Sequence, residues 1–208
     1  MQKIYSSKRG IGAGLIGGII AGIVMLIPMM FMMSMMDLPS DLFPILVGMS
    51  LGQSQESAAM IGIVIHFIPS ILIGIIFGAV ISTSKLSIKS FKKGISLGIA
   101  AGIISFAVIF IPMMMNVIPP TMLQLMQMMN PEAPQDMIMQ QLQSMQPMLL
   151  AGSFVSHIIY GIILGSITSG IVKKSKKEMT ENLCRRLTFF KFSSFRKNQL
   201  KIHYVTII

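Results

Sequence analysis

Residues 8–30 read KRGIGAGLIGGIIAGIVMLIPMM. Two basic residues precede a long run of Gly, Ala, Ile and other apolar residues. A helix needs about 20 such residues to cross the roughly 30 Å of hydrocarbon in a bilayer. The run is too long for the apolar core of a signal peptide, and no small-x-small cleavage site follows it. This stretch therefore predicts a membrane-spanning helix over residues 11–34.

Three further stretches of the same kind follow along the chain. Of all residues, 53% are hydrophobic and 12% are charged, which lies outside the range of soluble globular proteins. We predict an all-α membrane protein with four transmembrane helices, at residues 11–34, 58–82, 94–117 and 149–172.

The basic residues give the orientation of these spans. All 17 Lys and Arg residues fall in three segments, which are residues 1–10, 83–93 and 173–208. The charged residues in the other two connections are all acidic. Because Lys and Arg collect on the cytoplasmic side of membrane proteins, we predict that all three basic segments are cytoplasmic. The predicted location is the inner cell membrane, with both termini in the cytoplasm.

The basic segments also indicate partners. They flank apolar runs and form no stripe on a folded surface, so nucleic acid is not expected as a partner. We expect contacts with the lipid bilayer and with anionic lipid headgroups, worth about 1 kcal/mol for each basic residue near the surface. The Phe-rich tail after Lys177 is either a lipid anchor of this kind or an extension without a role. Cys184, the single cysteine, excludes an intramolecular disulfide.

An internal repeat relates the two halves of the chain. Residues 8–30 align without gaps on 92–114 (KKGISLGIAAGIISFAVIFIPMM), with identity at 12 of 23 positions. In the other two spans, GIIFG at 74–78 matches GIILG at 161–165. We therefore predict two parallel copies of a two-helix hairpin, residues 11–82 and 94–172, related by a pseudo-twofold axis along the membrane normal.

Glycines recur at every fourth position in these spans, and such residues share one helix face. Their missing side chains let two helix backbones approach closely, either within the bundle or across a homo-oligomer. The predicted packing positions are Gly10, Gly14, Gly18, Gly22, Gly74, Gly78, Gly94, Gly98, Gly102, Gly161 and Gly165.

Residues 12–17 also fit the pattern G-x-G-x-x-G, but the strand that a dinucleotide site requires does not precede them, so no cofactor of that kind is expected.

Two histidines are the only spanning side chains that titrate near neutral pH. His66 and His157 lie at about equal depth, nearer the acidic connections than the basic ones. An ionisable residue within the membrane indicates a functional site. The alternative is a neutral imidazole that bonds a neighbouring helix. Pro28 and Pro112 lie in the same half of their spans, where a kink would open a cavity near the histidines.

Methionine is unusually frequent, with 22 residues. Thioethers are soft ligands that favour Cu(I), and helical spacing places residues four apart on one face. Apolar filling by an adaptable side chain is the alternative interpretation. The candidate metal ligands are Met25, Met29, Met33, Met113, Met114, His66 and His157.

The connections on the acidic side contain apolar segments that are too short to cross. We predict that residues 42–50, together with short amphipathic helices in the Met-, Gln- and Pro-rich loop 119–147, lie at the bilayer surface.

The sequence resembles the YagU-like family of small uncharacterised prokaryotic inner-membrane proteins, over roughly residues 8–175. The motifs that carry the resemblance are GIIAGIV at 18–24, MDLP at 36–39, GIAAGII at 98–104, Pro112-Met113, Pro119-Pro120, and HIIYG at 157–161 before Gly165. The resemblance implies four spans and membrane residence. It implies no activity, so no functional residue is carried over. The excess of Met and the Phe-rich tail depart from the family pattern.

No paired carboxylates, phosphate loop or activated nucleophile is present in the sequence, and we do not expect an enzyme. The leading hypothesis is a structural or interaction protein assembled through the glycine positions. The alternatives are a Cu(I)-binding or Cu(I)-transporting protein that uses the Met clusters and both histidines, and a small-solute transporter or channel.

Overall fold

The computed structural model describes the backbone of residues 2–82, 86–88 and 90–205. It divides into two units, residues 1–169 and 170–208. The second unit consists of the last part of one long helix, and most of its side chains, including the Phe-rich tail and Cys184, lie outside the described residues. Part of the predicted loop 83–93 lies outside them as well. The site described below belongs entirely to the first unit.

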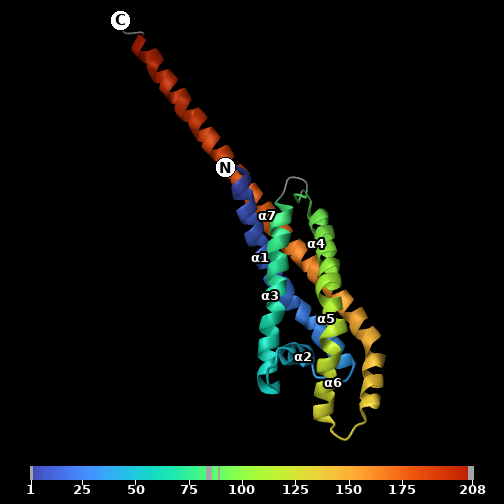
Figure 1. Ribbon diagram of the computed structural model, residues 1–208. Helices are drawn as coiled ribbons and strands as arrows, with labels where there is room; N and C mark the ends of the chain where they lie inside the picture. The colour runs from blue at the N-terminus through green and yellow to red at the C-terminus, as the bar shows by residue number, and fades with distance from the viewer. Residues whose placement is uncertain (1, 83–85, 89, 206–208) are drawn as a thin grey trace. The chain divides into compact units, whose positions relative to one another are not determined.

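The described chain is helical, as predicted (Figure 1). The elements are α1 (Gln2–Met35), α2 (Leu42–Ser50), α3 (Gln55–Ile81), α4 (Phe91–Ser105), the π-helix η1 (Phe106–Phe110), α5 (Ile111–Asn116), α6 (Ile118–Met129) and α7 (Gln135–Val205).

Four of the described helical stretches are long and apolar enough to cross a membrane, which confirms the predicted number of spans. They are Lys8–Met35, Gln55–Ile81, Phe91–Asn116 and Gln135–Ser175. The third combines α4, η1 and α5. The fourth begins at Gln135, well before residue 149, at which the hydropathy pattern predicted its start. Gln and Met are good helix formers, so α7 continues through the segment that was predicted as part of the outer loop.

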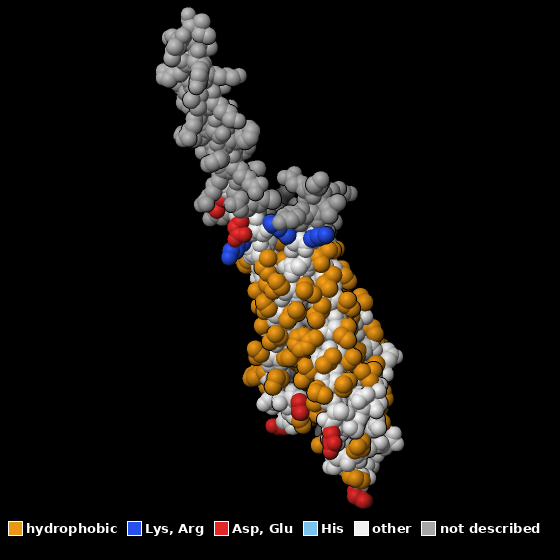
Figure 2. Space-filling view, turned by 90° about the vertical axis from the view of Figure 1, so that its left-hand side faces the viewer, with side chains coloured by type: hydrophobic (Ala, Val, Ile, Leu, Met, Phe, Trp, Pro, Cys, Tyr) orange, Lys and Arg blue, Asp and Glu red, His pale blue; other side chains and the backbone are white. Residues whose placement is uncertain are grey.

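The first span has its large side chains on the outside. Ala21 is fully buried and Gly14 and Gly18 are buried, whereas Ile23 is 52% and Ile27 66% exposed. A soluble protein would place isoleucine inside, because burial removes apolar surface from water. In lipid the interior offers no such gain, and small residues are selected for close packing. Hydrophobic side chains cover the face seen in Figure 2 between its charged ends. The chain is therefore a membrane protein.

Backbone contact between glycines joins α1 to α3. A Cβ added to Gly14 would overlap the carbonyl oxygen of Gly74 and lie 2.8 Å from the Cα of Gly78. One turn earlier, a Cβ on Gly10 would overlap the hydroxyl of Ser82. Because every added methyl here meets a backbone or a short side chain, the two helices cannot approach this closely without glycine.

The same contact joins α4 to α7. A Cβ added to Gly98 would overlap the carbonyl oxygen of Gly161 and lie 2.9 Å from the Cα of Gly165. Similarly, a Cβ on Gly94 would overlap the hydroxyl of Ser169. The two glycine faces are thus occupied within the chain, and neither is left open for a second copy.

A π-helical turn interrupts the third span. The backbone N–H of Ile111 donates to the carbonyl of Phe106, five residues earlier. The next residue, Pro112, has no N–H to continue the α-helical pattern. The π-helix η1 therefore lies directly before Pro112, where the sequence predicted a kink, and it places Phe106 and Phe110 against His157 of α7. Such turns are frequent at functional sites.

A hydrophobic core, here called the Met-rich core, closes the end of the bundle at which α2 and α6 lie (Figure 1). Its buried residues are Met32, Met33, Leu42, Leu46, Phe110, Met114, Ile118, Met122, Leu125 and Leu149. Within α2, Leu42, Leu46 and Val47 are buried, and a Cβ on Gly48 would overlap Ala58 of α3. The segment 42–50, which was predicted to be too short to cross, forms the helix α2, and one of its faces packs into the protein. Its position at the bilayer surface stays a prediction.

Candidate functional site

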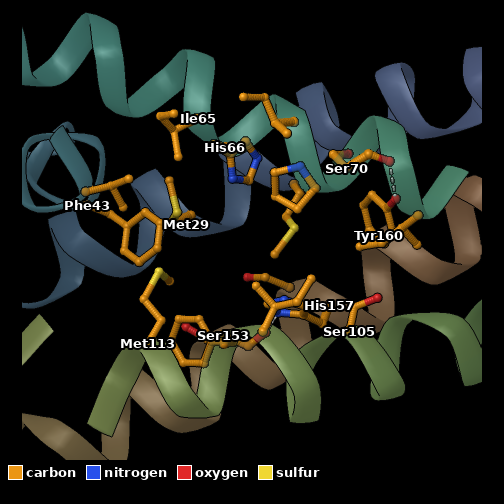
Figure 3. A pocket seen from close by; sticks show the side chains of 18 residues that line it. Met29, Phe43, Ile65, His66, Ser70, Ser105, Met113, Ser153, His157 and Tyr160 are labelled. Atoms are coloured by element: carbon orange, nitrogen blue, oxygen red, sulfur yellow. Dashed lines mark hydrogen bonds between the residues drawn. The ribbon is translucent and has the colours of Figure 1, made fainter. Parts of the chain in front are cut away.

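A cavity of about 320 Å³ lies inside the first unit, between the α1/α3 pair and the segments η1, α5 and α7. Its volume is at the lower end of the range for small-molecule sites. Figure 3 shows side chains entering it from both sides, with His66 and Met29 facing His157 and Met113. Most of its wall is apolar, and Tyr160 and several serines supply hydroxyl groups.

The structure brings five of the seven predicted metal ligands to this one cavity. Three of them are methionines, Met25 and Met29 on α1 and Met113 on α5, and the other two are the histidines. The remaining two predicted ligands, Met33 and Met114, are 2% and 4% exposed and pack in the Met-rich core instead. Met33 lies two turns beyond Met25 on α1, past the end of the cavity.

The imidazole of His66 reaches from α3 to α1. Its Nε2 lies 3.4 Å from the carbonyl oxygen of Gly22. Since a carbonyl can only accept, this nitrogen carries the proton in the bonded tautomer. The ring also contacts Phe67 edge-on, with centroids 5.7 Å apart. The Nδ1 atom of His66 then keeps its lone pair.

The imidazole of His157 is held by its own helix and by η1. Its Nδ1 lies 2.8 Å from the carbonyl oxygen of Ser153, one turn earlier on α7. Phe106 and Phe110 pack on the ring with centroids 5.5 and 5.7 Å away. By the same reasoning as for His66, Nδ1 is the donor and Nε2 keeps its lone pair. The π-helix thus contributes directly to the site.

Most hydroxyl groups of the cavity wall donate a hydrogen bond to a backbone carbonyl. Ser70 donates to Gly18 at 2.8 Å, and Tyr160 donates to Ser70 at the same distance. The hydroxyls of Ser105 and Ser156 each donate to the carbonyl four residues earlier. These groups therefore offer lone pairs to the cavity, as do the two histidines and the thioethers.

The end of the cavity toward the basic segments is closed by tight helix contacts. A Cβ added to Gly17 of α1 would lie 2.6 Å from the hydroxyl oxygen of Thr168 and 3.2 Å from Leu164, both on α7. Leu164 and Thr168 are completely buried.

Sequence reasoning missed several contributors. Ser105 was detectable, because it is a hydroxyl residue in an apolar span and its equivalent in the first copy of the repeat is Ala21. The role of Tyr160, which bonds across to α3, follows only from the three-dimensional arrangement, as do the contacts of Phe106 and Phe110.

Among the residues that the structure describes, no cluster of three or more His, Cys, Asp or Glu could hold a metal ion. A metal site at this cavity would therefore depend on thioethers.

Comparison with known proteins found no matching family model, no matching curated protein and no matching solved structure. Membership of the YagU-like family stays a prediction.

Proposed function

We propose that this chain is a four-span protein of the inner membrane that binds a small solute in the cavity between two repeated hairpins. The observation that carries the proposal is the position of the cavity relative to the repeat. When 8–30 is aligned on 92–114, and 74–78 on 161–165, equivalent residues of both halves line it. The equivalent pairs are Met25/Ile109, Met29/Met113, His66/Ser153, Pro69/Ser156, Ser70/His157 and Ile73/Tyr160.

This placement resembles the organisation of transporters. Solute sites in duplicated membrane proteins lie between the repeats, near the pseudo-symmetry axis. The cavity occupies the half of the spans nearer the acidic connections, and the glycine contacts close the other half. With both termini in the cytoplasm, the solute would enter from the non-cytoplasmic side. The proposal assigns the chain no catalytic step.

The glycine positions give less support to a structural or interaction protein. That hypothesis rested on the glycine positions, which could pack either within the bundle or across a homo-oligomer, and on an interior without functional groups. The faces around Gly14 and Gly98 are instead covered by α3 and α7 of the same chain. A role in assembly would have to use another surface.

Reaction of introduced cysteines tests whether the cavity is reached by water. In a Cys184→Ser background, Ser153→Cys places a thiol in the cavity wall. A small, water-soluble thiosulfonate needs a hydrated thiolate, so we expect this variant to react from the non-cytoplasmic side.

Two controls accompany that measurement. Ile23→Cys faces outward at 52% exposure, and Thr168→Cys lies on the fully buried contact beyond the cavity. Neither variant should react, because the thiol of Ile23→Cys would face lipid and that of Thr168→Cys would be buried between helices. If Ser153→Cys is as unreactive as both controls, the cavity does not open to solution and the proposal fails.

A further inference from the structure

We propose that the solute is a soft monovalent metal ion, Cu(I) or Ag(I), held by thioethers and imidazole nitrogens of the cavity wall. The inference rests on the proposed function, since it names the ligand of the same cavity. The ligand set is Met25, Met29, Met113, His66 and His157.

The first argument is the chemistry of the wall. The hydroxyl protons of Ser70, Ser105, Ser156 and Tyr160 are all donated to backbone carbonyls. No Lys or Arg in the described part of the chain lines the cavity. A wall that presents lone pairs and no cation suits an electron-pair acceptor, and it disfavours an anion.

The second argument is the orientation of the histidines. A metal-binding His almost always donates its other ring N–H to a backbone carbonyl, a carboxylate or water, which fixes the tautomer and the ring plane. His66 makes such a bond to Gly22 at 3.4 Å, and His157 makes one to Ser153 at 2.8 Å. The free nitrogens, Nδ1 of His66 and Nε2 of His157, are left for an ion.

The third argument is the kind of ion that these ligands select. Met25 and Met29 are one turn apart on α1, and Met113 approaches from the opposite side (Figure 3). Thioethers are soft and select Cu(I), whereas Mg²⁺ and Ca²⁺ require oxygen ligands. Among the residues that the structure describes, no carboxylate lines the cavity. The cost of desolvating an ion rises with the square of its charge, so an uncharged cavity within the membrane accommodates a monovalent ion better than a divalent one.

The size of the cavity is compatible with this ligand. At about 320 Å³ it exceeds the volume of one ion. Methionine has three flexible side-chain torsions and repacks easily, so the thioethers can close around an ion after it enters. The surplus volume admits the ion with part of its hydration shell.

Metal binding by the purified full-length protein in detergent tests the inference. Ag(I), which requires no reductant, and Cu(I), kept reduced with ascorbate, are titrated against a chromogenic competitor. The test variants are Met29→Leu/Met113→Leu and His66→Phe/His157→Phe. Each should lower the affinity at least about tenfold, since even the outer partners of metal ligands contribute about 10–100-fold.

A matched variant controls for the other methionines. Met32→Leu/Met122→Leu changes two residues that are 7% and 2% exposed in the Met-rich core, outside the cavity wall. It should bind like the wild type. X-ray absorption of the Cu(I) complex should show both sulfur and imidazole nitrogen around the metal. Equal affinity in the cavity variants and the control, or sulfur-only coordination, would place any bound metal elsewhere and overturn the inference.

The two proposals fail differently. If the wild type binds neither ion while Ser153→Cys still reacts, the cavity takes another solute and only the metal assignment is wrong. If Ser153→Cys is also unreactive, the solute site itself is wrong.

Discussion

Thr168 is completely buried, and its hydroxyl oxygen has no hydrogen-bond partner. It lies on α7 against Gly17, where α1 and α7 meet. An unpaired hydroxyl in an apolar environment costs about 1–3 kcal/mol. The Thr168 hydroxyl therefore destabilises the folded protein. Valine has nearly the same branched shape as threonine and could occupy the same space without a hydroxyl.

We expect Thr168→Val to stabilise the protein by about 1 kcal/mol, because it removes the unpaired hydroxyl and keeps the branched shape. Thermal unfolding in detergent measures the change. Ser169→Ala is the control, since the Ser169 hydroxyl donates to Gly165 at 2.5 Å and its loss should not stabilise. A lower melting temperature for Thr168→Val would mean that the hydroxyl has a partner in the folded protein.

The two histidines show what residue-level sequence reasoning achieved at the candidate site. Their equal depth, deduced from span boundaries alone, agrees with their meeting in one cavity. Residues of similar depth need not face each other, however, and Met33 and Met114 were grouped with the candidates but pack elsewhere. Helical spacing identifies a common face, whereas the neighbouring helices decide what that face meets.

At the scale of the elements, the glycine faces are the feature most sensitive to substitution. We expect Gly14→Ala and Gly98→Ala each to lower stability by about 1–3 kcal/mol or more, because the new methyl would overlap a carbonyl oxygen of α3 or α7. Unfolding in detergent, followed by helical circular dichroism, reports the loss.

Gly12→Ala is the matched control for both variants. It lies on α1 only two residues from Gly14 but on another face of the helix, and a Cβ there meets no atom within 4 Å. It should be neutral or stabilising by up to about 1 kcal/mol, since Ala is the better helix former. Equal effects of Gly12→Ala and Gly14→Ala would contradict the close contact of α1 with α3.

The helices themselves were largely predictable, and their details were less so. The length of a span follows from the thickness of the bilayer, so four runs of suitable length gave the correct number of helices. The start of α7 at Gln135 was missed because hydropathy does not distinguish a helix leaving the membrane from a loop. Nor does hydropathy identify η1, in which the N–H of Ile111 donates to the carbonyl of Phe106, five residues earlier instead of four.

At the scale of the whole molecule, the orientation in the membrane is the most general prediction. Reporter tags inserted beside Glu56 or Asp136 should give non-cytoplasmic signals, whereas a tag beside Lys92 should give a cytoplasmic one. The physical reason is the excess of Lys and Arg in segments 1–10, 83–93 and 173–208. A cytoplasmic signal from either acidic connection would refute the topology.

At this scale the sequence is most informative about topology, through the distribution of charge, and least informative about the cavity. A cavity is the space that remains after all helices have packed, and no single stretch of sequence encodes it. The sequence did predict a kink at Pro112 near the histidines, where the cavity lies, but it predicted neither its volume nor its serine hydroxyls.

Direct backbone contact along α1/α3 and along α4/α7 has a mechanical consequence. Where carbonyl meets Cα with no side chain between them, as at Gly14 and Gly98, no rotamer change can loosen the pair. If the chain transports its solute as proposed, we therefore expect α1 with α3, and α4 with α7, each to move as one rigid body. The hydroxyl of Tyr160 on α7 donates to the carbonyl of Ser70 on α3 at 2.8 Å, so a motion of one pair relative to the other would have to break this bond.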